Sequence, residues 1–587
     1  MSGMLSTLKT IWRLAAPYFF RSEDRVAGRI LLGAVIAIEL SLVAIQVILN
    51  QWYNFFYNTL QDRNWTSFVN AIVFFCSLAV VYIVLAVYQL YLNQWLQIRW
   101  RRWLTQHYLG QWLEAANHYR MQLLGDAADN PDQRIAEDVR LFIDAGGTGV
   151  GILPIGLGIL NSVTTMFSFV VILWRLSEAA PLSLFGWTIH GYLVWAAVLY
   201  SILGTILTHL IGRALIRLTF MQQRYEADFR FNLVRTRENS EQIAMLGGED
   251  AERERHLMRF ANVVNNWRAI MQRQKRLTFF TASFSQASTI FPYVVVSPAY
   301  FSGAMQLGGL MQTASAFNSV QQALSYFVSS YRYIAEWRAI VERLSGFESA
   351  IERGRAAAVT PPVISVTPHD TRTGITVESL SVALPNNAPL VAADDIVIET
   401  GDHVLVTGPS GAGKSTLFRA ISGIWPFGSG RVTVPKGAKL MMLPQRPYFP
   451  IATLATAVSY PAEGGSFSQE RLVEALRAVG LPHLIERLDE EGHWNRVLSV
   501  GEQQRLAMAR AVLHEPDYLF LDEATASLDE PAEAALYRTL IERRKGATIV
   551  SIGHRATLDA FHRRRLTLVP SGARFQLRDT PAASAAE

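Results

Sequence analysis

The chain has 587 residues, long enough for two or more domains, and half of its residues are hydrophobic. Its mean hydropathy of +0.16 is high for a soluble protein and indicates membrane segments. A net charge of only +5 gives no reason to expect a nucleic-acid partner. The single cysteine, Cys76, excludes a disulfide within the chain and suggests no cysteine-based metal site.

Five apolar stretches are long enough to cross a bilayer, and a weaker sixth follows them. They lie at about 30–49, 70–92, 150–173, 191–211 and 278–301, with the sixth at about 307–331. Arginines precede the first stretch and gather after the second and the fourth, whereas the other connections carry few basic residues. By the positive-inside rule, the arginine-rich segments are cytoplasmic, which places both termini and the two long connections in the cytoplasm. Six spans satisfy this assignment.

These two connections, 94–146 and 212–276, are charged but helical in pattern, with few prolines or glycines. We read them as continuations of the membrane helices, with turns at Asn130-Pro131-Asp132 and near Gly247-Gly248. We expect such turns to dock onto the soluble part of the chain. A solvated charged helix without a partner is the alternative.

The sixth stretch carries a polar stripe, and the first contains a carboxylate. Ser315, Asn318, Gln322, Ser325 and Ser329 recur at spacings of three and four, which places them on one helix face. Because a polar stripe avoids lipid, it predicts a hydrated cavity for a polar solute; hydrogen bonding between helices is the alternative.

Glu39 lies near the middle of the first stretch, where a carboxylate is costly and therefore a candidate functional residue. It can bind a cationic group of a substrate or relay a proton. Alternatively, hydrogen bonds from neighbouring helices neutralise it.

Prolines at 361, 362 and 368 mark residues 346–373 as a linker between a membrane domain, 1–345, and a soluble α/β domain, 374–575, with a tail at 576–587. The soluble domain contains GPSGAGKST, which fits the phosphate-loop pattern between a strand at 403–407 and a helix starting near Lys414. Its members are Gly408, Pro409, Ser410, Gly411, Ala412, Gly413, Lys414, Ser415 and Thr416. Backbone N–H groups of the loop and Lys414 suit nucleotide phosphates, and the Ser415 hydroxyl can ligate Mg²⁺.

Four further segments indicate what the nucleotide does. Gln445 follows an apolar run and can contact Mg²⁺ and the attacking water. The segment LSVGEQQR opens a helix whose N-terminal residues, Ser499, Gly501 and Glu502, can bind phosphate. The strand YLFLDE ends in Asp522, a ligand for Mg²⁺, and Glu523, a general base for water; His554 can contact the γ-phosphate.

Together, these segments resemble the ABC-type ATPases throughout the soluble domain. In the first half, NQWYNFFYNTLQ, RWRRWLTQHYL and NPDQRIAEDVR resemble the bacterial SbmA/BacA-type uptake proteins with a fused ATPase, and the peroxisomal acyl-CoA half-transporters of subfamily D. The resemblance implies a six-helix membrane domain of the exporter type, ATP and Mg²⁺, and a homodimer in which Ser499 of one copy closes on the phosphate loop of the other. It also implies uptake of hydrophilic solutes, including peptides and cobalamin, across the bacterial inner membrane.

Two departures from the family pattern stand out. Leu384 occupies the place of the aromatic residue that stacks on adenine, which predicts relaxed base selectivity. Val500 replaces one residue of the usual glycine pair. ATP-driven transport is the leading hypothesis. An exporter of lipids or amphipathic drugs, and a membrane-anchored regulatory ATPase that moves nothing, are the alternatives.

Overall fold

The computed structural model describes residues 2–125, 130–144, 150–179, 182–184, 187–370 and 374–580. Two compact units divide the chain. The first comprises Met1–Leu109 and Asn130–Phe347, and the second comprises Gly110–Asp129 and Glu348–Glu587. The second unit is therefore discontinuous in sequence, because it takes a short segment from between two helices of the first.

The first unit consists mainly of helices, several of them very long. In the described part of the chain, five helices are long and apolar enough to cross a membrane. They are α2 (Arg25–Gln61), α3 (Trp65–Leu113), α7 (Ile152–Ala179), α8 (Tyr192–Glu238) and α10 (Glu249–Phe301). They contain the five apolar stretches expected from the sequence. The predicted sixth, α11 (Leu307–Ser329), is not among them, and the count of six spans stays a prediction.

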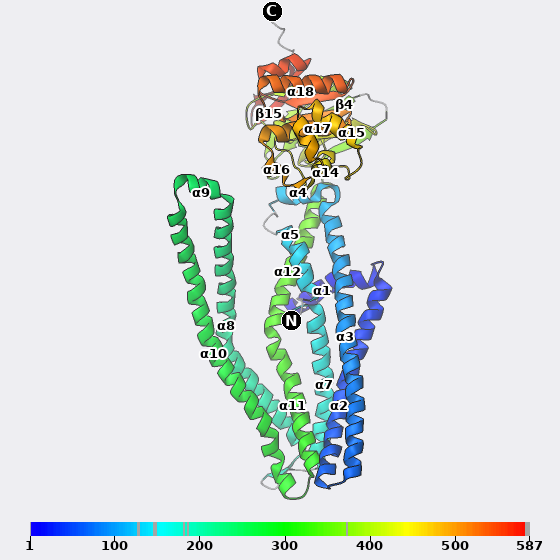
Figure 1. Ribbon diagram of the computed structural model, residues 1–587, viewed down its shortest axis with the longest axis vertical. Coiled ribbons are helices and arrows are strands. Elements are labelled where there is room, and N and C mark those ends of the chain that lie inside the picture. The colour runs from blue at the N-terminus through cyan, green and yellow to red at the C-terminus, as the bar shows by residue number, and fades with distance from the viewer. Residues whose placement is uncertain are drawn as a thin grey trace, which may run out of the picture. The chain divides into compact units, whose positions relative to one another are not determined.

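The remaining helices of this unit are shorter or more polar. They are α1 (Ser2–Phe20), α5 (Pro131–Gln133), a π-helical turn (Arg134–Asp138), α6 (Val139–Ile143), α9 (Ser240–Leu246) and α12 (Tyr331–Ala357). Two three-residue strands, β1 (Leu182–Leu184) and β2 (Trp187–Ile189), pair in antiparallel fashion. Helices α8 and α10 run side by side, with α9 at their tip (Figure 1).

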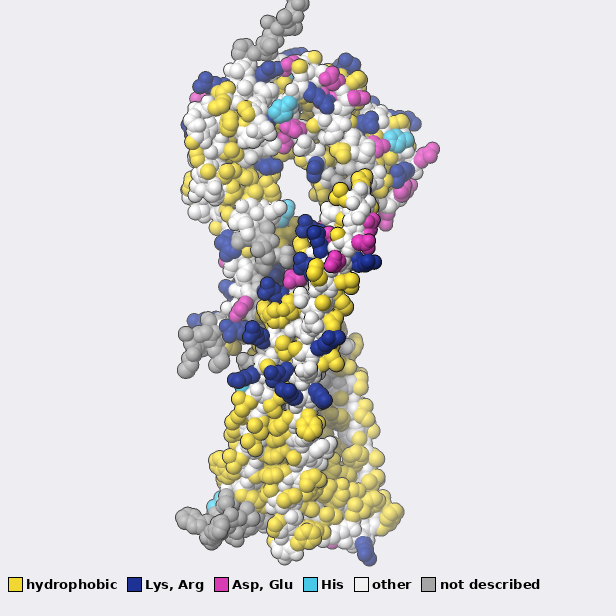
Figure 2. Space-filling model, turned by 90° about the vertical axis from the view of Figure 1, so that its left-hand side faces the viewer, with side chains coloured by type: hydrophobic (Ala, Val, Ile, Leu, Met, Phe, Trp, Pro, Cys, Tyr) yellow, Lys and Arg dark blue, Asp and Glu magenta, His cyan; other side chains and the backbone are white. Residues whose placement is uncertain are grey.

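Hydrophobic side chains cover one end of this unit in a broad band, and Lys and Arg side chains gather along its boundary (Figure 2). Beneath the band, α11 packs against α2, α7, α8 and α10. Phe169, Leu173, Leu193, Phe317 and Val320 form part of the buried cluster between these helices. The distribution is that of helices which bury one side against each other and expose the other to lipid.

The second unit is built on an eleven-stranded sheet with the order β3-β8-β4-β5-β15-β14-β7-β13-β12-β9, and β6 also pairs with β4. The strands are β3 (Ile364–His369), β4 (Gly374–Ala383), β5 (Pro389–Ala393), β6 (Ile396–Glu399), β7 (His403–Thr407), β8 (Gly428–Pro435), β9 (Leu440–Leu443), β12 (Tyr518–Asp522), β13 (Thr548–Ile552), β14 (Arg564–Ser571) and β15 (Arg574–Thr580). Strands β7, β13, β12 and β9 are parallel.

Helices cover both faces of the parallel part of the sheet, and β12 shows why. Every residue from Tyr518 to Leu521 is buried, and alternate side chains enter different clusters. Leu519 and Leu521 join one core cluster, whereas Tyr518 and Phe520 join the other. A continuous apolar run is the pattern of a parallel strand that is buried on both sides.

The helices of this unit are α4 (Asn117–Leu123), α13 (Lys414–Ile421), α14 (Leu454–Ser459), α15 (Gln469–Ala478), α16 (Trp494–Val497), α17 (Val500–His514) and α18 (Glu530–Arg543). A two-stranded ribbon joins β10 (Ala452–Thr453) to β11 (Glu491–Gly492). An all-helical membrane domain and an α/β phosphate-loop domain were both expected, and this fold class is confirmed.

The segment expected to be a linker contains regular structure. Helix α12 continues to Ala357, and β3 joins the sheet by pairing with β8. Of the expected tail, residues 576–580 belong to β15, and residues 581–587 lie outside the described residues. The prolines at 361 and 362 therefore mark only a short connection between α12 and β3.

The first of the two long connections, 94–146, contributes α4 to the second unit. After α3 ends, Ala115 and Ala116 adopt positive φ angles of 47° and 59°, which break the helix and redirect the chain. Asn117 Nδ2 then donates to the Ile351 carbonyl (3.1 Å), and Arg120 Nε donates to the Gly354 carbonyl (2.9 Å). The docking segment is therefore α4. The turn at Asn130-Pro131-Asp132, which we expected to dock, belongs to the first unit.

Candidate functional site: an ATP site and a polar membrane stripe

The phosphate loop lies between β7 and α13, at the positions expected from the sequence. Gly413 has φ = 90°, and a Cβ atom there would lie 2.7 Å from Val391 Cγ2, so only glycine fits. Lys414 Nζ donates to the carbonyls of Gly408 (2.9 Å) and Pro409 (3.0 Å), which holds the ammonium across the loop. Burial lowers the pKa of Lys414, while the nearby Glu523 and Asp522 partly offset this.

Two oxygen ligands suited to Mg²⁺ meet beside this loop. Ser415 Oγ donates to Asp522 Oδ1 (2.8 Å), so the first residues of α13 and the end of β12 are joined. Burial raises the pKa of Asp522, and the Ser415 hydrogen bond and Arg419 act against that shift. Hydroxyl and carboxylate oxygens are the ligands that Mg²⁺ prefers, so the residues fit this ion.

Glu523 is held from three sides at the carboxyl end of the parallel strands. Gln445 Nε2, which follows β9, donates to Glu523 Oε2 (3.2 Å). His554 Nε2, which follows β13, lies 3.3 Å from Glu523 Oε1. Glu523 itself has φ = 49°, and its backbone N–H donates to the Ile552 carbonyl (3.2 Å). A non-glycine residue in this region of φ is strained, and such strain clusters at functional sites.

The residues of LSVGEQQR that we expected to bind phosphate, here called the signature residues, lie on a different element, at the start of α17. Ser499 caps this helix, and its hydroxyl and backbone N–H both donate to Glu502 Oε2 (2.7 and 2.9 Å). The Ser499 hydrogen bond lowers the pKa of Glu502, with His483 adding to the effect. Gly501 packs near Leu528: a Cβ atom added to Gly501 would lie 3.3 Å from Leu528 Cδ2. Ser499 is exposed, and its hydrogen bonds go to Glu502 and not to the phosphate loop of the same chain.

In the membrane unit, the neighbouring helices cover the polar stripe of α11 only in part. Ser315, Asn318 and Ser325 are half-buried and Gln322 is exposed, whereas Ala316 and Phe317 on the other side are fully buried. The side chain of Ser329 lies outside the described part of the chain. The stripe therefore has a free surface in this chain.

Glu39 on α2 is buried and hydrogen-bonded through both carboxylate oxygens. Gln89 Nε2 of α3 donates to Oε2 (2.6 Å), and Asn161 Nδ2 of α7 donates to Oε1 (2.7 Å). Thr165 Oγ1 lies 3.5 Å from Asn161 Oδ1 and extends the network. Sequence reasoning singled out Glu39 but missed Gln89, whose only signal is that it is a polar residue within an apolar stretch.

Comparison with known proteins identifies both halves of the chain. The model of ABC transporter transmembrane region 2 matches residues 14–301, and the ABC transporter model matches residues 393–526. The inner membrane ABC transporter ATP-binding protein YddA of Escherichia coli is 32% identical over 92% of this chain and 94% of its own length. This chain belongs to the ABC transporter family.

Two further similarities refine the picture of this ABC transporter. The human protein named lysosomal cobalamin transporter ABCD4 is 28% identical over 82% of each chain. A bacterial Atm1-family ABC exporter, whose structure was solved with ATP bound, matches 94% of this chain and 95% of its own with a TM-score of 0.71 at 18% identity. That likeness concerns the fold, an exporter-type helical domain with an ABC ATPase domain.

The family assignment explains why one chain holds one phosphate loop and one signature helix. The protein is a half-transporter, a membrane domain fused to one ABC ATPase domain, and such proteins generally dimerise. ABC ATPase domains bind ATP and use Mg²⁺, and the loop, Ser415 and Asp522 described above fit both. Its ATPase is coupled to transport across a membrane.

Proposed function

We propose that this transporter imports hydrophilic solutes, such as peptides or cobalamin, across the bacterial inner membrane as a homodimer with six spans per chain. The observation that carries the proposal is the polar stripe of α11, whose described residues are half-buried or exposed within the chain. A stripe of hydroxyl and amide groups that avoids lipid suits a watery, two-chain cavity. The name of the cobalamin relative and the likeness to SbmA/BacA-type uptake proteins favour a polar cargo.

The roles of the ATP-site residues follow from their positions. Lys414 and the loop would bind the β- and γ-phosphates, and Ser415 with Asp522 would hold Mg²⁺, which would supply positive charge beside the phosphates. Glu523 orients and deprotonates the attacking water, while Gln445 and His554 keep its carboxylate in place.

The second copy completes the site. Ser499, Gly501 and Glu502 are arranged at a helix N-terminus, where backbone N–H groups attract phosphate. Ser499 is exposed in its own chain, so a nucleotide held by the other copy can reach its hydroxyl in exchange for the bond to Glu502. ATP then joins the two ATPase units, and its hydrolysis releases them.

Two segments, α4 and α9, are suited to transmit changes in the ATPase units to the membrane helices. Burial raises the pKa of Tyr119 on α4 and of Asp522, and Arg419 of the phosphate-loop helix acts against both shifts, so one guanidinium interacts with α4 and with the end of β12. At the tip of α8 and α10, Met245 and Leu246 of α9 are 77% and 84% exposed, an apolar surface suited to the ATPase unit of the second copy. Each ATPase unit would thus bias the helices of both chains.

Uptake of a labelled proline-rich peptide and of labelled cobalamin tests the proposal, in cells that lack their own importers. Wild type is compared with Glu523→Gln and with Glu542→Gln, a matched control at an exposed carboxylate of α18. We expect uptake in wild type and the control and none in Glu523→Gln at equal membrane abundance. ATPase activity without accumulation of either probe would refute import of these solutes, and stimulation by amphipathic compounds would favour export of lipids or drugs.

A further inference from the structure

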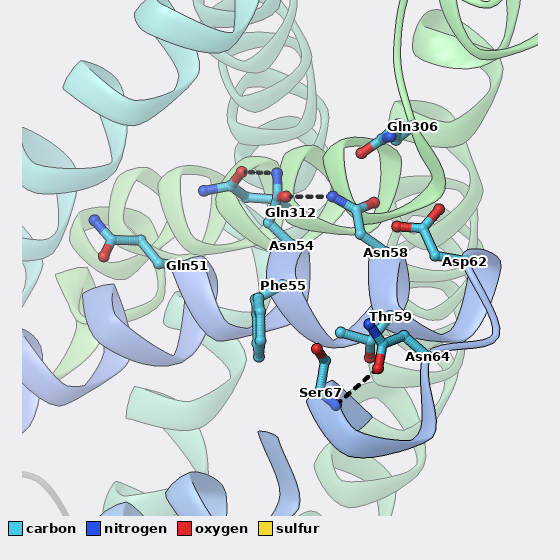
Figure 3. Close-up of a pocket in the computed structure, with 10 residues that line it drawn as sticks. All are labelled: Gln51, Asn54, Phe55, Asn58, Thr59, Asp62, Asn64, Ser67, Gln306 and Gln312. Carbon is cyan, nitrogen blue, oxygen red and sulfur yellow. Dashed lines mark hydrogen bonds between the residues drawn. The ribbon is translucent and has the colours of Figure 1, made fainter. Parts of the chain in front are cut away.

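A second polar feature of the membrane unit lies away from the stripe of α11. A pocket of about 510 Å³ opens where the end of α2, the turn into α3 and the start of α11 meet (Figure 3). Its lining includes Gln51, Asn54, Asn58, Asp62, Gln306 and Gln312. The charge pattern of the sequence assigns the connection at 51–67 to the outer side of the membrane. The volume is in the range of small-molecule sites.

One wall of this pocket is fixed by a chain of carboxamides. Asn54 Nδ2 donates to Gln312 Oε1 (2.7 Å), and Asn58 Nδ2 donates to Asn54 Oδ1 (2.8 Å). Asn58 Oδ1 accepts from the backbone N–H of Gly308 (2.8 Å), so the ladder joins α2 to α11. A Cβ atom on Gly308 would lie 2.0 Å from the Asn54 carbonyl oxygen, so the two helices are in close contact here.

The wall retains unused capacity for hydrogen bonds. A carboxamide has two N–H donors and an oxygen with two lone pairs, and the bonds above use only one donor of Asn58 and one lone pair of its oxygen. Gln51, Gln306 and Asp62 are exposed, and within the described residues none of their side chains has a hydrogen-bond partner. Residues 51 and 62 are about 16 Å apart along α2, so the polar groups can contact several positions of an extended ligand.

The charge of the lining is one-sided. Asp62 is its one ionisable residue, and no Lys, Arg or His belongs to the ten residues that line the pocket. A phosphate or carboxylate ligand would find no cation among these ten residues and would be repelled by Asp62. A neutral or cationic ligand with amide or hydroxyl groups would find complementary donors and acceptors.

We propose that this pocket is an outer binding site for neutral or cationic solutes that carry several amide or hydroxyl groups, and that it excludes anionic ones. The inference rests on the proposed function, because it names the class of solute that the transporter takes up. Asp62 sets the charge preference, and the carboxamides of Gln51, Asn58 and Gln306 supply the hydrogen bonds. The start of α11 connects the pocket to the polar stripe, since Gln312 precedes Ser315 by three residues.

Binding of two peptides to the full-length protein in lipid nanodiscs tests this site. The peptides have equal length and amide content, but one carries two Lys residues and the other two Glu residues. We expect wild type to bind the cationic peptide about tenfold more tightly, because one carboxylate near the ligand contributes roughly 1.4 kcal/mol. Asp62→Lys should reverse the order. Glu178→Lys, at an exposed carboxylate outside the lining, should leave the order unchanged.

A second pair of variants separates hydrogen bonding from charge. Gln51→Leu and Gln306→Leu should weaken both peptides equally, because neither residue carries charge. Equal affinity for the two peptides in wild type, or the same order in Asp62→Lys, would overturn the proposal. If charge selection fails while uptake still depends on Glu523, import stands and this site does not. If selection holds without uptake, the site stands and import does not.

Discussion

The docking of α4 onto the ATPase unit depends on one buried guanidinium. Arg120 is 5% exposed, and it donates through Nε to the Gly354 carbonyl (2.9 Å) and through Nη1 to the Ala115 carbonyl (2.6 Å). Hydrogen bonds from a charged group contribute about 1.5–3 kcal/mol each. Burial lowers the pKa of Arg120, a sign that desolvation opposes part of this gain, so we take the lower value for each bond. Arg120→Ala should therefore cost about 3 kcal/mol of local stability.

Hydrogen exchange measured by mass spectrometry reports that loss directly. If α4 opens locally, a loss of about 3 kcal/mol accelerates exchange of its amides on the order of a hundredfold. The effect should be confined to peptides that cover 117–123 and the end of α12. Arg477→Ala, at an exposed arginine of α15, is the matched control. Unchanged exchange in α4, or an equal increase throughout the ATPase unit, would refute the argument.

Three further predictions concern the ATPase unit. Ser415→Ala removes the hydroxyl beside Asp522, so the Mg²⁺ concentration for half-maximal ATPase activity should rise about tenfold or more, and an unchanged magnesium titration would exclude this role. Burial lowers the pKa of His562 from 6.5 to about 4, so the unfolded state takes up this proton first as the pH falls. Stability that is complete above pH 6.5 should decrease by about 3 kcal/mol towards pH 4, and urea unfolding of His562→Gln should show a correspondingly weaker dependence on pH. Leu384→Tyr supplies an aromatic face for adenine, so the KM for ATP should fall about fivefold while that for GTP changes less; equal changes for both nucleotides would count against base stacking.

Local patterns predicted the strand and the helix that flank the phosphate loop, because this motif resides in one short segment. The phosphate loop needs a strand, glycines and a helix in direct succession, and the structure has them at the expected residues. Strand β12 was equally clear, since a fully apolar run that ends in two carboxylates is typical of a buried parallel strand. The meeting of Gln445, Glu523 and His554 follows once neighbouring parallel strands end at the same edge.

The docking segment was misplaced for a physical reason. The chain reverses at Ala115 and Ala116, two residues with no preference for positive φ, so no glycine or proline marks the break. The partners of Glu39 were also out of reach, because Gln89 and Asn161 come from other helices and only their packing brings them together. The predicted linker overlaps α12 and β3, because Pro368, one of the three prolines that suggested it, lies in a strand at the sheet edge.

Helix α4 belongs to the ATPase unit although it lies in the first quarter of the sequence. This has a practical consequence for expression of the ATPase half alone. A truncated protein that starts near residue 348 would lack Asn117 and Arg120, and the carbonyls of Ile351 and Gly354 would lose their donors. Tyr119 and Leu123 would also be missing from the edge of a core cluster, which would bare apolar surface. Poor solubility of such a fragment would then reflect where it was cut, and supplying residues 110–129 as a separate peptide should restore it.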